Sequence, residues 1–594
     1  MADRCGCDEC GVMKILFSII IGFSIVVLPV AYGEAGGALA NEMTGCGLLL
    51  FFLAVVIVLL FKNILKRDNS FRKIRISVID SFVICSLFYL AFNFMFIDEC
   101  RTDKYVFYGW GAVIIGYLLL RSGIVVLDIL LCACCVSGGI QSVIVICQRW
   151  GIVSGNNIQF DITGSLGNPG QIGGYIAVCS VITLGLLGHF AGNKRTLCVW
   201  LLSAALIVQS YALFLADSRA AWVAAILGMV VVLGKNFLGI RAYCKKYRIA
   251  VIWMVCSIMF LGGIWMYKYR PASADARLLI WRVSGEMIMD KPAFGHGYSS
   301  FARDYMLYQA DFFKENPHSS FSSVADNVIY PFNEFVGITV RYGIIGLLVV
   351  VLLFSSALLA CCGYLKSNIF KAALLTLLLF SFFSYPTEIF PLLMFYPFLL
   401  GGIDSRIVFS FSLSYWMYGL VLMMAIAWGI YAVKDGRFLK RMSDSLSSLY
   451  QKGEDIREDD YDKIKKNVSF NDYYMTWLSG QSDMEMKTYK RIKEIQPSCE
   501  GYCTLGKYYM AHLDYRNAEY FLNLASYMIP TRMRPKYYLW ELYACRQNRS
   551  KAQEIARDIL VMPLKVENSF TLKVKRRMRR YITASPAPGF PPLP

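Results

Sequence analysis

The chain has 594 residues, of which 56% are hydrophobic and 17% are charged, whereas ordinary soluble domains carry roughly 25% charged residues. This composition excludes a plain cytosolic enzyme. The net charge of +18 comes from basic clusters that lie between long apolar runs rather than on one continuous face, so a membrane is a better expected partner than nucleic acid.

Apolar runs suited to crossing a bilayer recur through the first two thirds of the chain. They lie at residues 12–32, 46–62, 77–97, 105–120, 122–148, 171–191, 196–214, 220–240, 248–267, 334–360, 368–385, 387–402 and 411–433. A helix rises 1.5 Å per residue, so roughly 20 apolar residues cross a hydrocarbon core about 30 Å thick. We therefore predict an all-α, polytopic membrane domain over residues 12–436, with about 12–13 transmembrane helices.

The basic loops determine the expected orientation. The loop around Glu34 and Glu42 has no cation, whereas the next loop carries Lys62, Lys66, Arg67, Arg72, Lys73 and Arg75. By the positive-inside rule the second loop is cytoplasmic. Residues 1–11 then form a cytoplasmic tail, and the long hydrophilic loop 268–333 faces the periplasm. The first run could also be a cleaved signal peptide, which would leave the orientation of the rest unchanged.

Thirteen spans would place the residues that follow them in the periplasm as well. A basic cluster after the last run favours the opposite side, and it consists of Lys434, Arg437, Lys440 and Arg441. We take the count of spans over this cluster and predict a periplasmic C-terminal domain.

Residues 437–583 are charged and aromatic, with helical periodicity. One stretch resembles a tetratricopeptide repeat, in which small residues let two antiparallel helices approach and a proline ends the second helix. The matching residues are Tyr502, Leu505, Gly506, Tyr509, Ala518, Leu522, Ala525 and Pro530. The resemblance implies either a concave surface for a protein partner or a helical lid that stabilises the membrane domain. Residues 584–594 are proline-rich and are expected to be disordered.

Two further features of composition carry weaker signals. Cys5, Cys7 and Cys10 have metal-like spacing, but a structural zinc site requires four ligands and no fourth is nearby, so we expect no metal there. The basic run at 573–580 is read as a solvated helix face, with contact to anionic lipid headgroups as the alternative.

Arginines on the predicted outer side are the candidates for chemistry. Arg219 opens a span, Arg277 and Arg282 lie in the long loop, and Arg303 lies further along it. A guanidinium at the edge of hydrocarbon needs a partner, and an anionic ligand would suit it. The plainer alternatives are a salt bridge from Arg219 to Asp217, snorkelling into headgroups, and an ordinary solvated loop.

The sequence around these arginines forms an ordered set of motifs. In chain order the set comprises residues 164–175, the run Asp217-Ser218-Arg219-Ala220-Ala221-Trp222, residues 277–281, residues 290–298, Asn333-Glu334-Phe335, Gly343-Ile344-Ile345-Gly346 and Tyr385-Pro386. Over roughly residues 10–405 the chain resembles the O-antigen ligase and polymerase superfamily of bacterial envelope glycosyltransferases. A tetratricopeptide tail on that membrane domain resembles a known variant of the family.

This resemblance implies an inner-membrane enzyme that takes a glycan from undecaprenyl diphosphate and joins it to an acceptor hydroxyl in the periplasm, without a metal or cofactor. The acceptor could be lipid A core, which we favour, a protein hydroxyl or another repeat unit. Matching motif to motif makes Arg219 and Arg277 the residues that hold the diphosphate, with Arg282 in reserve. Asn168, Asn333 and Arg303 are further candidates for substrate binding.

The chain departs from the family pattern at one position. The family often has a histidine directly before the asparagine of the Asn333-Glu334 motif, and this chain has Phe332, which cannot act as a general base. His296 and His318 could substitute, although a lone loop histidine is usually solvated. Glu334 and Asp326 are the carboxylate alternatives.

Two other classes of function compete with a transferase. A transporter or flippase would show inverted repeats and charges deep inside spans, whereas the candidate charges here cluster on one outer face. A scaffold that recruits envelope enzymes through its tail would make the arginines dispensable.

Overall fold

The computed structural model describes residues 2–35, 40–66, 73–98, 105–157, 160–236, 271–360, 365–412, 415–452, 497–563 and 567–583. Within these ranges the protein is built of helices and one small sheet. Eight helices are long and apolar enough to cross a membrane, and three shorter apolar helices accompany them. The prediction of an all-α, polytopic membrane protein is therefore confirmed. The expected span at 248–267 lies outside the described residues.

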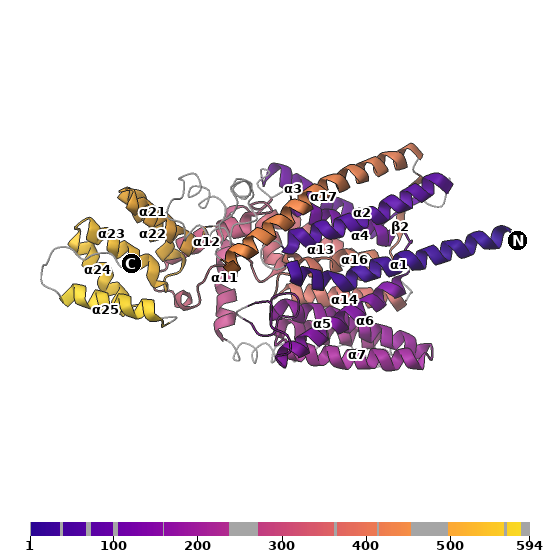
Figure 1. Cartoon of the computed structure of the whole chain (residues 1–594), viewed down its shortest axis with the longest axis horizontal. Coiled ribbons are helices and arrows are strands. Elements are labelled where there is room, and N and C mark those ends of the chain that lie inside the picture. The colour runs from indigo at the N-terminus through magenta and orange to yellow at the C-terminus, as the bar shows by residue number, and fades with distance from the viewer. Residues whose placement is uncertain are drawn as a thin grey trace.

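The bundle helices run along the long axis of the molecule (Figure 1). They are α1 (Ala2–Ala35), α2 (Ala40–Lys66), α3 (Val78–Phe96), α4 (Val106–Arg121), α5 (Leu127–Arg149), α6 (Pro169–Gly192), α7 (Thr196–Leu215), α8 (Arg219–Asn236), α13 (Glu334–Leu359), α14 (Leu365–Ser381), α15 (Phe390–Leu393), α16 (Phe395–Gly401) and α17 (Tyr415–Lys452). Small residues permit close packing between neighbours. A Cβ on Gly45 of α2, for example, would lie 2.9 Å from the Cα of Gly109 of α4.

Three bundle elements differ from the sequence prediction. Helix α1 begins at Ala2, so residues 2–11 of the expected tail continue the first span as helix. The run 387–402 is not one helix but η3 (Pro386–Glu388), α15 and α16. The prolines in this run explain the breaks, because a proline removes a backbone donor and clashes with the preceding turn of a helix.

The third difference lies in the last run, 411–433, which starts in a strand. Strand β2 (Ile407–Ser412) pairs antiparallel with β1 (Lys73–Ser77), and the apolar part of α17 lies later than predicted, at Gly419–Arg441. The alternating pattern of β1 and β2 is too short to be distinguished from a span flank by hydropathy alone.

Helix α13 is broken at Gly343, where the backbone adopts φ 67° and ψ −176°. The segment 292–297 fills the break. Ile344 N–H donates to Pro292 O at 2.8 Å, and His296 N–H donates to Val340 O at 2.9 Å. The segment 292–297 and the broken turn of α13 therefore satisfy each other's backbone donors and acceptors, as buried peptide groups require.

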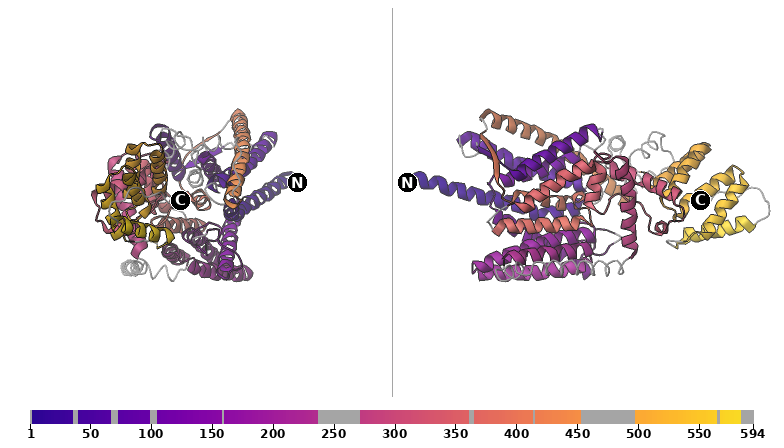
Figure 2. Two further views of the ribbon diagram at one scale, coloured as in Figure 1. Left: turned by 60° about the vertical axis from the view of Figure 1, so that its left-hand side comes forward. Right: turned by 180° about the vertical axis from the view of Figure 1, so that it is seen from behind.

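The loop expected at 268–333 is described from Pro271 and is largely helical. It contains α11 (Pro271–Asp290), α12 (Ser300–Glu315) and η2 (Ser320–Ser323). These elements cover one end of the bundle, and the C-terminal helices lie beyond them on the same side (Figures 1 and 2). The N-terminus lies at the opposite end of the molecule.

The C-terminal domain consists of α21 (Cys499–Ala511), α22 (Tyr515–Met528), α23 (Met533–Cys545), α24 (Arg549–Val561) and α25 (Ser569–Thr583). In the first hairpin, a Cβ added to Gly506 would lie 2.5 Å from Leu522, so the glycine permits α21 and α22 to touch. Residues 453–496, which belong to the predicted C-terminal domain 437–583, lie outside the described residues.

Two hydrophobic cores divide this domain. Tyr502, Phe521 and Met528 of the first hairpin belong to the same core as Phe312 and Phe313 of α12. The helices α23, α24 and α25 pack around a second core, which also includes Ala518 and Leu522 of α22. The first hairpin is thus continuous with the loop that covers the bundle.

Candidate active site

The structure brings Arg219 and Arg277 together at the end of the bundle that carries α11 and α12. Arg219 is the first residue of α8, directly after a tight turn in which Asp217 adopts φ 47°. Its Nη2 lies 3.5 Å from Oγ of Ser273, in the first turn of α11. Arg277 follows one turn later on α11. A short turn after α7 and a helix laid across the bundle end therefore place two guanidinium groups near each other.

The pKa of Arg277 reflects its burial and a neighbouring cation. Burial, followed by the positive charge of Arg219, lowers the pKa of Arg277, and nearby Tyr385 opposes this shift. Two cations held close in a partly desolvated region repel each other unless an anion lies between them. A diphosphate would supply that charge.

Aromatic side chains form a wall beside Arg277. Its guanidinium lies 5.8 Å from the ring centre of Phe332, within cation–π range. The Phe332 ring meets Tyr385 edge-on at 5.1 Å, and Tyr330 stacks on Tyr385 at 4.3 Å. Trp281 Nε1 donates to Pro331 O at 3.1 Å and holds the segment in place. Phe332 thus supports Arg277 at the position where the family often has histidine.

Gln171, in the first turn of α6, faces the same wall and was not predicted. It is 1% exposed, its Nε2 lies 3.4 Å from Oγ of Ser384, and its amide also hydrogen-bonds Tyr385. Its Oε1 has no hydrogen-bond partner among the described residues. Two features of the sequence could have pointed to Gln171. It lies within the 164–175 motif, and its partner Tyr385 belongs to the Tyr385-Pro386 motif.

The two candidate asparagines begin helices. Oδ1 of Asn168 accepts from Gly170 N–H at 2.8 Å at the start of α6. Oδ1 of Asn333 accepts from Phe335 and Val336 N–H at 3.0 and 3.2 Å at the start of α13. Such N-caps satisfy otherwise unpaired helix donors. Both asparagines therefore shape the site through their helices, and direct contact with substrate stays a prediction.

Glu334 is committed to a buried ion network. It is 3% exposed, and its Oε1 lies 3.2 Å from Nη2 of Arg341. Arg341 also pairs with Glu388, and Thr387 donates to Glu334. This network ties the start of α13 to the η3 turn, two residues beyond Tyr385. Its geometry favours a structural role over that of a general base.

Three of the four remaining candidates have partners on α11 and α12, and His318 is exposed. His296 is 5% exposed, with Nε2 at 2.8 Å from Met287 O. Arg303 Nε and Nη2 donate to the two carboxylate oxygens of Asp304, each at 2.7 Å. Arg282 is exposed and lies over the ring of Phe312 at 5.2 Å, and His318 is exposed in the turn after α12. None of these contacts joins the four residues to the Arg219–Arg277 pair.

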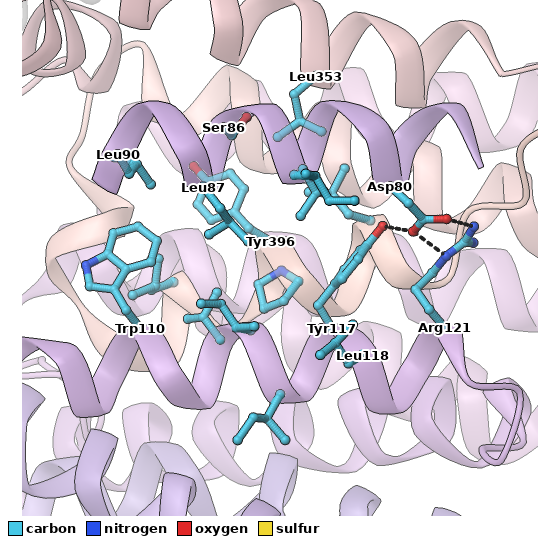
Figure 3. A pocket seen from close by; sticks show the side chains of 18 of the residues that line it. Asp80, Ser86, Leu87, Leu90, Trp110, Tyr117, Leu118, Arg121, Leu353 and Tyr396 are labelled. Carbon is cyan, nitrogen blue, oxygen red and sulfur yellow. Dashed lines mark hydrogen bonds and ion pairs between the residues drawn. The ribbon is translucent and has the colours of Figure 1, made fainter. Parts of the chain in front are cut away.

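A cavity of about 1270 Å³ lies beside this site, between α2, α3, α4, α13, α16 and α17. Its walls are almost entirely apolar, and the side chains labelled in Figure 3 come from α3, α4, α13 and α16. Glu334, Thr387 and Glu388 line it where the bundle meets α11 and α12. Thr387 and Glu388 lie two and three residues after Tyr385 in the chain, so this end of the cavity is adjacent to η3.

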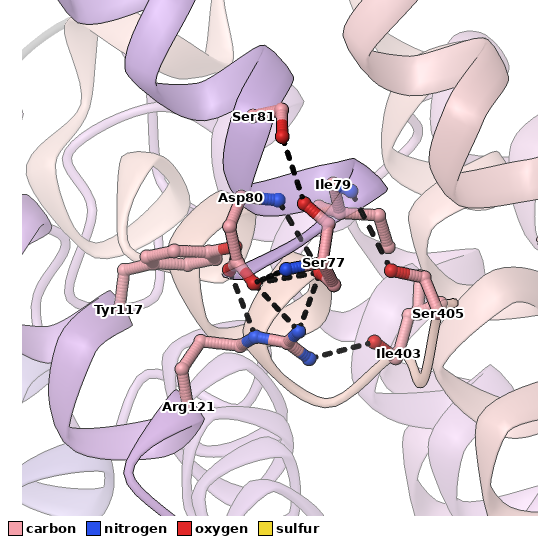
Figure 4. A network of polar contacts seen from close by, with 8 residues as sticks. All are labelled: Ser77, Ile79, Asp80, Ser81, Tyr117, Arg121, Ile403 and Ser405. Atoms are coloured by element: carbon pink, nitrogen blue, oxygen red, sulfur yellow. Dashed lines mark hydrogen bonds and ion pairs between the residues drawn. The ribbon is translucent and has the colours of Figure 1, made fainter. Parts of the chain in front are cut away.

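A polar cluster closes the other end of the cavity (Figure 4). Arg121 Nε and Nη2 each lie 2.9 Å from the carboxylate oxygens of Asp80, and Arg121 Nη1 donates to Ile403 O at 3.1 Å. Ser77 and Asp80 cap α3 reciprocally. The cluster fixes β1, α3 and α4 to the turn before β2.

Residues 203–351 match the family model for O-antigen ligase. The match runs from within α7 to within α13, so it contains Arg219, Arg277 and the loop helices. It supports the O-antigen ligase superfamily and a ligase-type or polymerase-type glycosyltransferase activity in this multi-pass membrane protein. No curated protein matches the chain.

Proposed function

We propose that the protein moves a glycan from undecaprenyl diphosphate to an acceptor hydroxyl on the periplasmic face of the bacterial inner membrane, with lipid A core as the favoured acceptor. The observation that carries the proposal is the pairing of Arg219 with Arg277, next to a lipid-sized cavity and inside the matched family region.

The chemistry follows from the charge that develops on the leaving group. The acceptor oxygen attacks the anomeric carbon, the bond from that carbon to the phosphate oxygen breaks, and the electron pair leaves with the lipid diphosphate. Guanidinium groups can hold this growing charge through charge-assisted hydrogen bonds, each worth about 1.5–3 kcal/mol. In a site with little water, such fixed charges take the part that a metal ion plays elsewhere.

The proton of the acceptor hydroxyl requires a base. His296 and Glu334 are both buried with partners of their own, which makes them poor bases in this geometry. His318 is exposed, and the side chain of Asp326 is about half exposed although it pairs with Arg532 at 3.0 Å, so these two candidates stay within reach of an acceptor. Variants at these two positions would distinguish them.

The cavity suits the apolar part of the donor. A polyprenyl chain needs an apolar channel that opens near the charged site, and this cavity meets the polar residues Thr387 and Glu388 at that end. Burial of an isoprenoid chain contributes roughly 25 cal/mol per Å² of apolar surface. The chain would therefore hold the diphosphate beside the arginines.

The helical hairpins α21–α22 and α23–α24 suit a tetratricopeptide-like binding domain. Stacked helix pairs of this kind present a concave surface for a protein partner. The partner could carry the acceptor, so a protein O-oligosaccharyltransferase, or a polymerase that extends repeat units, is the alternative within the same family.

Deletion of the gene, followed by glycan analysis, tests the proposal. Loss of long-chain glycan from lipid A identifies a ligase, loss of glycan from secreted proteins a protein transferase, and shortened chains a polymerase. Arg219→Ala and Arg277→Ala in the complementing copy should each abolish transfer, with the protein still in the membrane. Arg195→Ala, at an exposed position just before α7, is the matched control and should transfer normally. Normal transfer by both arginine variants at the site would exclude the mechanism and favour a transporter or scaffold.

A further inference from the structure

The segment 326–332 links the C-terminal domain to the arginine site. At one end, Asp326 pairs with Arg532 at 3.0 Å, and Asn327 Oδ1 accepts from Cys499 N–H at 3.3 Å. At the other end, Tyr330 and Phe332 form the wall beside Arg277. Only a few residues separate the two ends, so a shift at Asp326 must be taken up close to Phe332.

Gln309 of α12 holds this segment through hydrogen bonds of its side-chain amide. The side chain is fully buried. Its Nε2 donates to Met528 O at the end of α22 at 2.6 Å and to Asp326 O at 3.2 Å. One amide group therefore joins three parts of the chain: the loop helix, the site segment and the first C-terminal hairpin.

The exposed contacts around this junction are weaker anchors. Arg532 and Asp326 have side chains that are 45% and 49% exposed, and pairs of this kind add little to stability. A buried amide that serves two carbonyl oxygens is a stronger constraint, because both oxygens lose their partner if it is removed. The shared core of Phe312, Phe313 and Met528 surrounds it.

We propose that Gln309 is a positioning residue for the transferase, which holds the segment 326–332 against the first C-terminal hairpin and thereby sets Phe332 under Arg277. The hairpin α21–α22 is then a working part of the active site. Partner binding falls to α23, α24 and α25, which pack around the second core and do not contact the segment 326–332 through any of the contacts above. This inference rests on the proposed function, because Gln309 affects transfer only through the contact between Phe332 and Arg277.

Two variants of the full-length protein test it. Gln309→Met keeps the length of the side chain and removes both hydrogen bonds, and Gln309→Glu keeps its shape and polarity but cannot donate when ionised. Misplacement of a positioned group by about 1 Å can reduce a rate up to about 100-fold. We therefore expect both variants to lower transfer at least about tenfold per folded protein, measured as consumption of the host's lipid-linked glycan in membrane vesicles.

Gln209 of α7 offers a matched control. It is also fully buried, its Nε2 donates to Cys135 O at 3.1 Å, and its Oε1, like that of Gln309, has no partner within the described residues. Gln209→Met should lower thermal stability about as much as Gln309→Met does, yet leave the rate per folded protein unchanged. Equal rate losses in the two variants would overturn the proposal, because they would mark a general effect of removing a buried amide.

A double-mutant cycle separates positioning from simple destabilisation. If Gln309 acts through Phe332, Gln309→Met should cost much less in a Phe332→Leu background than in the wild type, because the two changes affect one path. An undiminished loss in that background would contradict the proposal, as would wild-type rates for both Gln309 variants. Arg277→Ala is assayed alongside: full activity in that variant would reject the transferase mechanism itself, whereas its inactivity beside active Gln309 variants would reject only the positioning role.

Discussion

Arg277 shows how a single residue acquires its chemistry from its surroundings. The sequence placed it in a hydrophilic loop, where a solvated arginine is the ordinary expectation. In the structure it lies over Phe332, and burial, followed by the charge of Arg219, lowers its pKa. The residue type was visible in the sequence, but its ring partner and its neighbouring cation were not.

This environment predicts a pH dependence for Arg277→Lys. Burial and the charge of Arg219 both disfavour a cation at this position, so they should lower the pKa of the new lysine below its ordinary value of about 10.4. The charged form is the functional one and is lost as pH rises through that lowered pKa. Transfer by the variant should therefore be highest at low pH and fall about tenfold per unit above the pKa.

Rates measured between about pH 6 and about pH 9 would test this expectation. The wild type should show no such decline that depends on residue 277, because arginine keeps its charge throughout. Arg195→Lys, at the exposed position just before α7, is the control. A flat profile for Arg277→Lys would mean that the site does not desolvate the cation.

At the scale of elements, the break in α13 explains two motifs at once. The Gly343-Ile344-Ile345-Gly346 run and the 290–298 run are about 50 residues apart in the sequence, yet each supplies backbone partners for the other. Gly343 has a positive φ where its backbone lies close to Ala293, and Gly295 has a positive φ where its backbone lies close to Arg341. The glycines serve close backbone approach here, and His296 between them is fixed by the same contact.

We expect Gly343→Ala to destabilise the protein strongly. Alanine at φ 67° costs about 1–3 kcal/mol in backbone strain alone, and the added Cβ would collide with the carbonyl of Ala293. Thermal unfolding of the detergent-solubilised protein measures the effect. Gly285→Ala is the control, since that glycine lies inside α11 with nothing within 4 Å of an added Cβ, and it should be neutral or slightly stabilising. Equal melting temperatures for the two variants would contradict this account of the break.

The first C-terminal hairpin depends on a close contact of the same kind. Gly506→Val would place side-chain atoms where Leu522 now lies, so overpacking should separate α21 from α22 at a cost of about 1–3 kcal/mol. Limited proteolysis should then cut within residues 499–528 at protease levels that spare the wild type. Arg516→Val, which adds the same side chain at an exposed position of α22, should leave the digestion pattern unchanged; early cleavage there would point to helix propensity instead.

At the scale of the whole molecule, the C-terminal domain lies on the same side of the bundle as the loop helices α11 and α12. The contact is direct, through Gln309 and Met528 and through Asp326 and Arg532. This arrangement agrees with an odd number of crossings before residue 437. It is at variance with the basic cluster after the last span, which by itself favoured the opposite side.

Reporter fusions test this arrangement. A reporter joined after residue 459 and one inserted in the exposed turn at His318 should respond as if in the same compartment, which we expect to be the periplasm. A fusion after Lys66 should respond as if on the other side. Opposite responses from the first two fusions would show that the contacts between α12 and α22 do not form in cells.

The sequence alone determined the helical membrane class of the protein and most of its spans, and it singled out Arg219, Arg277 and the long loop. Hydropathy, loop charge and helix period are local properties, so they can be read without knowing which helices touch. Only the tertiary structure decided that Phe332 and Tyr385 form the wall beside Arg277, that Glu334 and His296 have buried partners, and that the first C-terminal hairpin shares a core with α12. These pairings join segments far apart in the chain, and they depend on the close packing of side chains, which a linear pattern does not encode.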